Sequence, residues 1–308
     1  MIVDASSSRL EQERHRREAF VRRRLGHDPD SLESMDLTRF MHGGPGRLLR
    51  CRVCGLGLRE EDEEAKYQAD RYDTELMRHL YPRYLQAFRK KRSGYRPLLR
   101  PGAEVLEVGS HLGAFLQTAE EWGWRPTGLD VGEFTSAFGR REGFSVKRMP
   151  LEDYSPRLKR PDAIFVWNCF EQLEDPFGTL RRSHQLLNRH GVLVVRVPNA
   201  AFYRAQRRNL ETTGGALRTL GLNNLLGFPY LHGYTPATLT RLLRSMNFEP
   251  LAAHNSSLLT PPYPDLSATV REEWRNVRRE AVRSNAIDGP WIEIVSRRVD
   301  SGSTRKPL

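Results

Sequence analysis

The sequence predicts an α/β protein organised around a mostly parallel sheet. From residue 103 to residue 197, short apolar runs alternate with segments of helical periodicity. The runs AIFV at 163–166 and VLVV at 192–195 are apolar at every position, which is typical of strands buried on both faces. Strands and helices that alternate along a chain form right-handed β–α–β units, and these units give a parallel sheet with helices on its faces.

The individual elements follow from hydrophobic spacing and from turn residues. Apolar runs predict strands at 103–108, 126–130, 144–148, 162–167, 191–197 and 291–295, and a weaker one at 250–258. Helical spacing predicts helices at 113–122, 133–142, 176–188 and 265–283. Thr235 and Pro236 are typical of a helix start, with an N-cap hydroxyl followed by proline in the first turn, so a helix is expected over 235–246.

Three further parts of the chain differ from this alternating pattern. An N-terminal extension is expected at 1–98, with a charge-dense helix at 8–25, a polar loop at 27–34 and a long helix at 73–92 that Pro82 should kink or split. The α/β domain is expected at 99–299 and a disordered tail at 300–308. Within the domain, the glycine-bearing segment 199–234 is expected to be an insertion that caps the substrate side.

Length and composition indicate a globular protein rather than a membrane or disulfide-rich one. The 308 residues are 38% hydrophobic with three cysteines, and no apolar run reaches the roughly 20 residues that span a bilayer. The N-terminus lacks the apolar core of a secretory signal, so a cytoplasmic location is expected. The net charge of +11 is dispersed and has no basic stripe interleaved with aromatic residues, which disfavours a nucleic-acid partner.

The most informative motif is VLEVGSHLGAFL at 105–116, where a strand, a glycine-spaced turn and a helix follow one another. Gly109 and Gly113 would let the backbone approach a ligand where a Cβ atom would intrude. A dinucleotide-binding fingerprint requires G-x-G-x-x-G, and His111 stands where its second glycine should be. The spacing therefore disfavours an NAD site.

Candidate ligand-binding residues also follow the later strands, because ligands lie beyond the carboxyl ends of parallel strands. Asp130 follows the glycine turn by about twenty residues, which suits a carboxylate that accepts hydrogen bonds from a ribose, caps the next helix, or does both. Leu151 follows the third strand, where apolar groups could hold an adenine or form an ordinary turn. Asn168 and Glu171 follow the fourth strand.

Taken in order, five segments resemble class I S-adenosylmethionine (SAM)-dependent methyltransferases: LEVGSHLGAFL, GLDVG, DAIFVWNCFEQLEDP, LLNRHGVLVVRVPN and HGYTPATLTRLLRSMNFEP. The resemblance spans residues 101–298 and implies a Rossmann-like, seven-stranded sheet whose last strand, 291–295, is antiparallel. It implies SAM as the cofactor, held at its amino-acid part by the glycine turn, at its ribose by Asp130 and at its adenine by Leu151. The full implied set is Glu107, Gly109, Ser110, His111, Gly113, Asp130, Val131, Leu151 and Asn168.

Two departures from the family pattern concern the reactive end of the cofactor. His111 replaces the middle glycine of the first motif, and Gln172 stands where relatives with Leu-Glu-His carry histidine. Glutamine cannot accept a proton, so a base, if the reaction needs one, must come from Glu171, His232 or Tyr234. These three and Gln172 are the candidate catalytic residues, although for His232 the favoured interpretation is a plain surface residue that precedes the helix.

The segment Cys51-x-x-Cys54-Gly55, between strand-like runs within 47–58, resembles one knuckle of a zinc ribbon. A structural zinc needs four ligands, and the chain has no second cysteine pair. His27, His42 and Cys169 are the most plausible spare ligands. We therefore expect a degenerate ribbon whose reduced cysteines bind no metal.

The function predicted from these observations is methyl transfer from SAM to an O, N or C nucleophile of a small molecule. Two alternatives stay open. The charge of +11 motivates a nucleic-acid methyltransferase, and the departures at His111 and Gln172 motivate a non-catalytic SAM-binding protein. Neither the acceptor nor the oligomeric state follows from the sequence.

Overall fold

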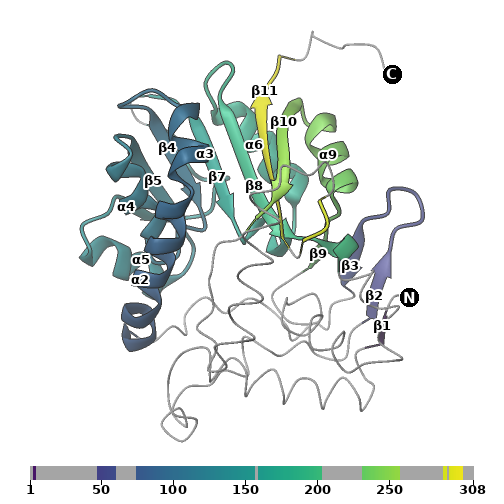
Figure 1. Ribbon diagram of the computed structural model, residues 1–308, viewed down its shortest axis with the longest axis horizontal. Helices are drawn as coiled ribbons and strands as arrows, with labels where there is room; N and C mark the ends of the chain where they lie inside the picture. The colour runs from purple at the N-terminus through teal and green to yellow at the C-terminus, as the bar shows by residue number, and fades with distance from the viewer. Residues whose placement is uncertain are drawn as a thin grey trace, which may run out of the picture.

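The computed structural model describes residues 3–4, 47–59, 74–156, 159–202, 231–256, 287–289 and 291–300. Its centre is a seven-stranded sheet with the strand order β10-β11-β8-β7-β4-β5-β6 (Figure 1). The strands are β4 (Glu104–Val108), β5 (Arg125–Asp130), β6 (Val146–Arg148), β7 (Ala163–Trp167), β8 (Val192–Pro198), β10 (Phe248–Asn255) and β11 (Trp291–Arg298).

The pairing of these strands confirms the predicted fold class. Strands β4 to β8 pair in parallel, whereas β11 runs antiparallel to both β8 and β10. Strand β11 thus lies between β10 and β8, although it is the last of the three in sequence. The expected antiparallel last strand is therefore confirmed, and the predicted range 291–295 is three residues short at its C-terminal end.

Helices cover both faces of the sheet (Figure 1). On one face, α2 (Thr74–Lys90), α3 (Arg92–Tyr95) and α4 (Ala114–Glu121) pack on the sheet through a core rich in aromatic residues that includes Phe88, Phe115 and Phe165. Helix α5 (Glu133–Arg141) packs beside α2 through Phe138. On the other face, α6 (Pro176–Leu186) and α9 (Pro236–Ser245) cover an aliphatic core.

Local sequence signals explain where the helices begin. The Asp175 side chain accepts a hydrogen bond from the Gly178 N–H at the start of α6, and Thr235 and Thr238 form a reciprocal capping box at the start of α9. The expected split of the long helix at Pro82 is wrong, because α2 continues through this residue to Lys90. Pro82 is exposed, so the carbonyl that loses its helical partner lies on the solvent side, and packing of Phe88 holds the next turn.

A second, small sheet joins the N-terminal extension to the segment before α9. Its order is β1-β2-β3-β9, with β1 (Val3–Asp4), β2 (Arg47–Arg50), β3 (Gly57–Arg59) and β9 (His232–Gly233). The strand-like runs predicted around the cysteine turn are confirmed as β2 and β3. Gly57 lies opposite Gly233, and a Cβ atom on Gly57 would be 3.1 Å from the Gly233 carbonyl oxygen.

Several predicted segments lie outside the described residues. These are the helices at 8–25 and 265–283, the loop at 27–34, residues 203–230 of the insertion and residues 301–308 of the tail. Among the described helices, none is long and apolar enough to cross a membrane.

Candidate active site

The glycine turn after β4 alternates left-handed and ordinary backbone. Gly109, His111 and Gly113 have φ angles of 73°, 47° and 77°. Left-handed backbone is costly for most residues with a side chain, although histidine adopts it more readily than most. His111 therefore departs from the family pattern in residue type but keeps the left-handed backbone that a glycine adopts easily.

Protein side chains fill the space beside the two glycines of this turn. A Cβ atom on Gly109 would lie 2.8 Å from the Cys169 sulfur, and one on Gly113 would lie 2.5 Å from the Phe144 ring. The packing role of these glycines, with Cys169 and Phe144 as partners, was not foreseen from the sequence.

Glu107 and Ser110 present polar atoms that lack partners within the described part of the chain. Glu107 lies in β4 and is 3% exposed, and its Oε2 atom, like the Ser110 hydroxyl, is buried without a hydrogen bond. Burial, together with the nearby Asp130 carboxylate, raises the pKa of Glu107 well above its ordinary value of 4.5. A buried carboxyl group without donors is costly, so this corner is suited to a ligand that brings donors.

Asp130, at the end of β5, ties the glycine turn to the start of α5. Its Oδ2 atom accepts a hydrogen bond from the His111 N–H at 2.7 Å, and its Oδ1 atom accepts from the Gly132 N–H at 2.8 Å and from the Thr135 hydroxyl at 2.6 Å. Asp130 was expected to cap the next helix, but Gly132 is the N-cap residue of α5, and Asp130 instead holds the helix start through Gly132 and Thr135. Each carboxylate oxygen can accept about two hydrogen bonds, so Oδ2 retains capacity beyond the His111 contact. The neighbouring Val131 is 49% exposed.

Leu151, which was predicted to pack on the adenine, and Asn168, which was predicted to face the methionine end of SAM, have different surroundings. Leu151 is 2% exposed and belongs to the main core. Asn168, directly after β7, has a φ angle of 55°, and its side-chain oxygen accepts a hydrogen bond from the Arg196 guanidinium. The Gln172 side chain donates to the Asn168 backbone oxygen at 2.6 Å, so this amide secures the loop after β7.

The three remaining catalytic candidates come together at the same edge of the sheet. Glu171 lies in the short helix η4 (Phe170–Gln172), and its carbonyl accepts a hydrogen bond from the N–H of Leu231, the residue that precedes β9. The rings of His232 and Tyr234 are 6.0 Å apart. Both Glu171 carboxyl oxygens, the Tyr234 hydroxyl and His232 Nδ1 are buried without partners among the described residues. His232 is half-buried, which is not the position of a plain surface residue.

Burial sets the protonation of this cluster. It raises the pKa of Glu171 to about 8 and lowers that of His232. Burial, together with the charge of Glu171, raises the pKa of Tyr234. Carboxyl, phenol and imidazole are therefore all predominantly uncharged at neutral pH.

Cys169 joins this cluster to the glycine turn. Its thiol donates to the Val108 carbonyl at 3.2 Å, and its pKa is raised well above 9.0 by burial and by the charges of Glu171, Asp130 and Glu107. Cys169 also lies beside Gly109, and Asp130 accepts a hydrogen bond from the His111 N–H of the same turn. The predicted residues after β4, β5 and β7 therefore lie close together at one edge of the sheet.

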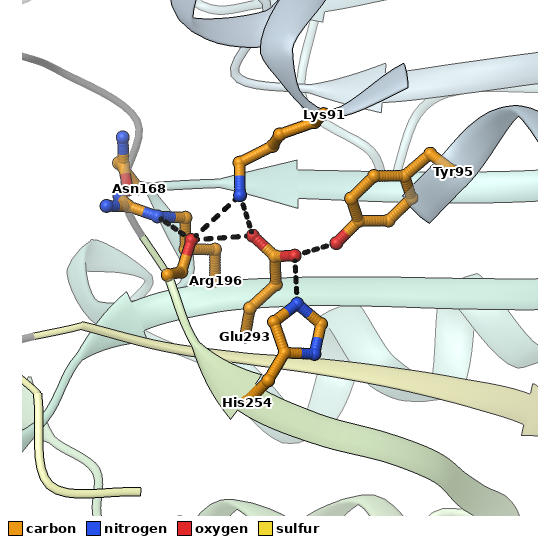
Figure 2. Close-up of polar contacts among 7 residues, drawn as sticks. Lys91, Tyr95, Asn168, Arg196, His254 and Glu293 are labelled. Atoms are coloured by element: carbon orange, nitrogen blue, oxygen red, sulfur yellow. Dashed lines mark hydrogen bonds and ion pairs between the residues drawn. The ribbon is translucent and has the colours of Figure 1, made fainter. Parts of the chain in front are cut away.

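A buried ionic network next to this site was not foreseen (Figure 2). Glu293 in β11 pairs directly with Arg196 in β8 in the sheet register. The Glu293 carboxylate lies 3.1 Å from Lys91 Nζ, accepts a hydrogen bond from the Ser256 hydroxyl at 2.7 Å and contacts Tyr95 and His254. The available signal was a charged residue inside each of two apolar strands, VLVVRVP and WIEIV.

The N-terminal cysteines are free thiols. The Cys51 N–H donates to the Leu56 carbonyl at 2.8 Å, and its carbonyl accepts from the Gly55 N–H at 3.0 Å, which closes the turn between β2 and β3. Across the described ranges, no group of three histidine, cysteine or acidic side chains surrounds a possible metal position. The candidate ligands His27 and His42 lie outside those ranges.

The strand order and pairing define an α/β protein with a Rossmann-like sheet, and the candidate site residues lie at its carboxyl edge. Residues 70–253, more than half of the chain, match a family model described as a methyltransferase domain, so the chain belongs to this family. No curated protein matches the chain.

Three solved structures of low sequence identity are similar to this chain. One is the methyltransferase in a complex with the Trm112 methyltransferase activator of Haloferax volcanii, at 14% identity and a TM-score of 0.52, with 73% of this chain and 94% of that chain covered. Another is a SAM-dependent methyltransferase from Archaeoglobus fulgidus, at 16% identity and a TM-score of 0.48, with coverage of 73% and 100%. A third is the plantazolicin methyltransferase BpumL, at 14% identity and a TM-score of 0.46, with coverage of 71% and 84%.

Proposed function

We propose that this protein is a SAM-dependent methyltransferase whose acceptor is a small molecule. The observation that carries the proposal is the turn between β4 and α4, where the buried Glu107 Oε2 atom has no partner among the described residues and the Asp130 carboxylate accepts a hydrogen bond from the turn. Membership of the methyltransferase family makes SAM the expected ligand of this turn.

The residues present fit a ligand of this kind. SAM carries an ammonium group and ribose hydroxyls, which are hydrogen-bond donors. The site offers an unpaired acceptor at Glu107 Oε2, and Asp130 Oδ2 can accept a further hydrogen bond beside the one from His111. The Ser110 hydroxyl adds a buried polar atom without a partner. The exposed Val131 side chain next to Asp130 would cover an apolar part of the ligand. Gly109, His111 and Gly113 would shape the turn. Leu151 would pack on the adenine, and Asn168 would face the methionine end of SAM.

When bound, SAM supplies a methyl group on a positively charged sulfur, which is already electrophilic. The protein's main contribution is then to hold the acceptor in line with that group, which can supply roughly 7–11 kcal/mol in favourable cases. The cluster of Glu171, His232 and Tyr234 is suited to the acceptor because it offers unpaired polar atoms beside Cys169 and the turn. This cluster supports an enzyme over a protein that only binds SAM.

Calorimetry with S-adenosylhomocysteine tests the proposal. Wild-type protein should bind this product of SAM, and Asp130→Ala should weaken binding by roughly 10- to 100-fold, since a hydrogen bond to a charged group contributes about 1.5–3 kcal/mol. Glu120→Ala, an exposed acid in α4, is the matched control and should bind like the wild type. Folded wild-type protein that shows no binding at millimolar ligand would refute the proposal.

A further inference from the structure

Glu171, Tyr234 and His232 form a cluster of polar groups that the described protein leaves incomplete. Glu171 and Tyr234 are both 0% exposed, and neither carboxyl oxygen nor the hydroxyl has a hydrogen-bond partner among the described residues. The Nδ1 atom of His232 is also buried without a hydrogen-bond partner among these residues. Buried polar groups are nearly always paired, and each unpaired one costs about 1–3 kcal/mol, so several in one place point to a ligand that completes them.

The cluster borders the turn that would hold the cofactor. Glu171 follows Cys169 by two residues, and the Cys169 thiol contacts the end of β4 and responds to the charges of Glu107, Asp130 and Glu171. The Cys169 sulfur lies beside Gly109 of the turn, only 2.8 Å from where a Cβ atom on that glycine would be. Glu171 is therefore the candidate base that lies next to the turn along the chain.

Basicity separates Glu171 from its neighbours. Burial makes its carboxylate a stronger base than usual, with a pKa of about 8, whereas burial makes the His232 imidazole a weaker one. Tyr234 holds its proton more tightly than usual, and the Gln172 amide has no proton-accepting nitrogen. The charged group that acts on Glu171 is Arg196 in β8, which lowers its pKa. Cys169 and Tyr234 face it as uncharged neighbours.

We propose that Glu171 is the proton acceptor of the methyl-transfer reaction, that the attacked group is an uncharged hydroxyl, and that the Tyr234 hydroxyl holds the acceptor oxygen. This inference rests on the proposed function. It specifies that function by naming the base and the chemical class of the acceptor group.

In the proposed reaction, the acceptor oxygen forms a bond to the methyl carbon while the electron pair of the carbon–sulfur bond returns to sulfur. The proton of the acceptor hydroxyl passes to the Glu171 carboxylate, so the products are a methyl ether, S-adenosylhomocysteine with an uncharged thioether sulfur, and a protonated Glu171. A carboxylate acceptor would have no proton to give, and its charge would be repelled by ionised Glu171.

Glu171→Gln is the decisive variant, because it keeps the size of the side chain and removes the base. Glu174→Gln, an exposed residue of the same loop, is its matched control. Methyl transfer is measured with SAM labelled in its methyl group and a desalted small-molecule extract of the source organism. We expect Glu171→Gln to lower the rate by about 10²–10⁴-fold. We expect it also to abolish the rise in rate as Glu171 ionises around pH 8, with binding of S-adenosylhomocysteine retained.

Two readouts do not depend on the rate. The infrared spectrum of the wild type minus that of Glu171→Gln at neutral pH should contain the band of a protonated carboxyl group. The spectrum of the wild type minus that of Glu174→Gln should lack this band. The labelled product should keep its label in mild alkali, as an ether does, whereas a methyl ester would release labelled methanol. If Glu171→Gln does not fold, Tyr234→Phe replaces it, with an expected loss of roughly tenfold from one hydrogen bond to the acceptor.

The inference is wrong if Glu171→Gln transfers methyl groups within threefold of the wild type, or if His232→Asn rather than Glu171→Gln removes the pH dependence. An alkali-labile product would also overturn it. Absence of any transfer by wild-type protein that binds S-adenosylhomocysteine would overturn it as well, since a base without a reaction has no role. Failure of the wild type to bind S-adenosylhomocysteine would instead refute the proposed function.

Discussion

Replacing Gly113 by alanine should destabilise the protein through two separable effects. The φ angle of 77° places the residue in the left-handed region, where a side chain costs about 1–2 kcal/mol. The new Cβ atom would also lie 2.5 Å from the Phe144 ring, and overpacking of this kind costs about 1–3 kcal/mol. The expected loss in the free energy of unfolding is therefore about 2–5 kcal/mol.

Gly123 provides the matched control for this substitution. Its φ angle is 86°, yet a Cβ atom there would meet nothing within 4 Å, so Gly123→Ala should cost only the backbone effect of about 1–2 kcal/mol. Urea unfolding followed by the fluorescence of the buried Trp122, Trp124 and Trp167 measures both variants. The difference between them isolates the overlap with Phe144, and Phe144→Leu should reduce it. A Gly113→Ala variant as stable as Gly123→Ala would refute the assignment of Gly113 to packing.

Three further predictions concern buried charge and the cysteine turn. Burial raises the folded-state pKa of Glu107, so the folded protein keeps a proton that the unfolded chain releases, and wild-type stability falls as pH rises above 4.5 towards that raised pKa. Glu107→Gln does not titrate, so its free energy of unfolding in urea should rise relative to that of the wild type over this pH window. A difference that stays constant with pH would contradict the raised pKa of Glu107. Lys91→Met leaves the Glu293 carboxylate buried without its cation and should cost about 3–5 kcal/mol, whereas Lys159→Met, at an exposed lysine, should change the free energy of unfolding by less than about 0.5 kcal/mol. Metal analysis of wild type and Cys51→Ser should give no stoichiometric zinc in either, and one equivalent lost in the variant would reverse this expectation.

Much of the α/β domain could be predicted because its signals are local. The apolar runs of β7 and β8 and the Thr235–Pro236 helix start lie within a few residues of the elements they specify. Pro82 misled the prediction because propensity was weighed without the packing of Phe88, which holds α2 together beyond the proline.

The site was harder to predict than the fold because its parts are distant in sequence. The glycine turn could be located from spacing, but the partners of its glycines, Cys169 and Phe144, come from later segments. The pairing of Arg196 with Glu293 depends on the register between β8 and β11, which are nearly a hundred residues apart. Single-sequence periodicity carries no information about such a register.

The position of β11 has a consequence for the order of events during synthesis. Strand β10 is made before β11, but it joins the central sheet through β11, which lies between it and β8. The ribosome must therefore release residues 291–298 before β10 can pair, and the aliphatic surface later covered by Ile292 and Ile294 stays open until then. During this interval the nascent chain presents an unfinished sheet edge at β8, which is the kind of surface that molecular chaperones bind.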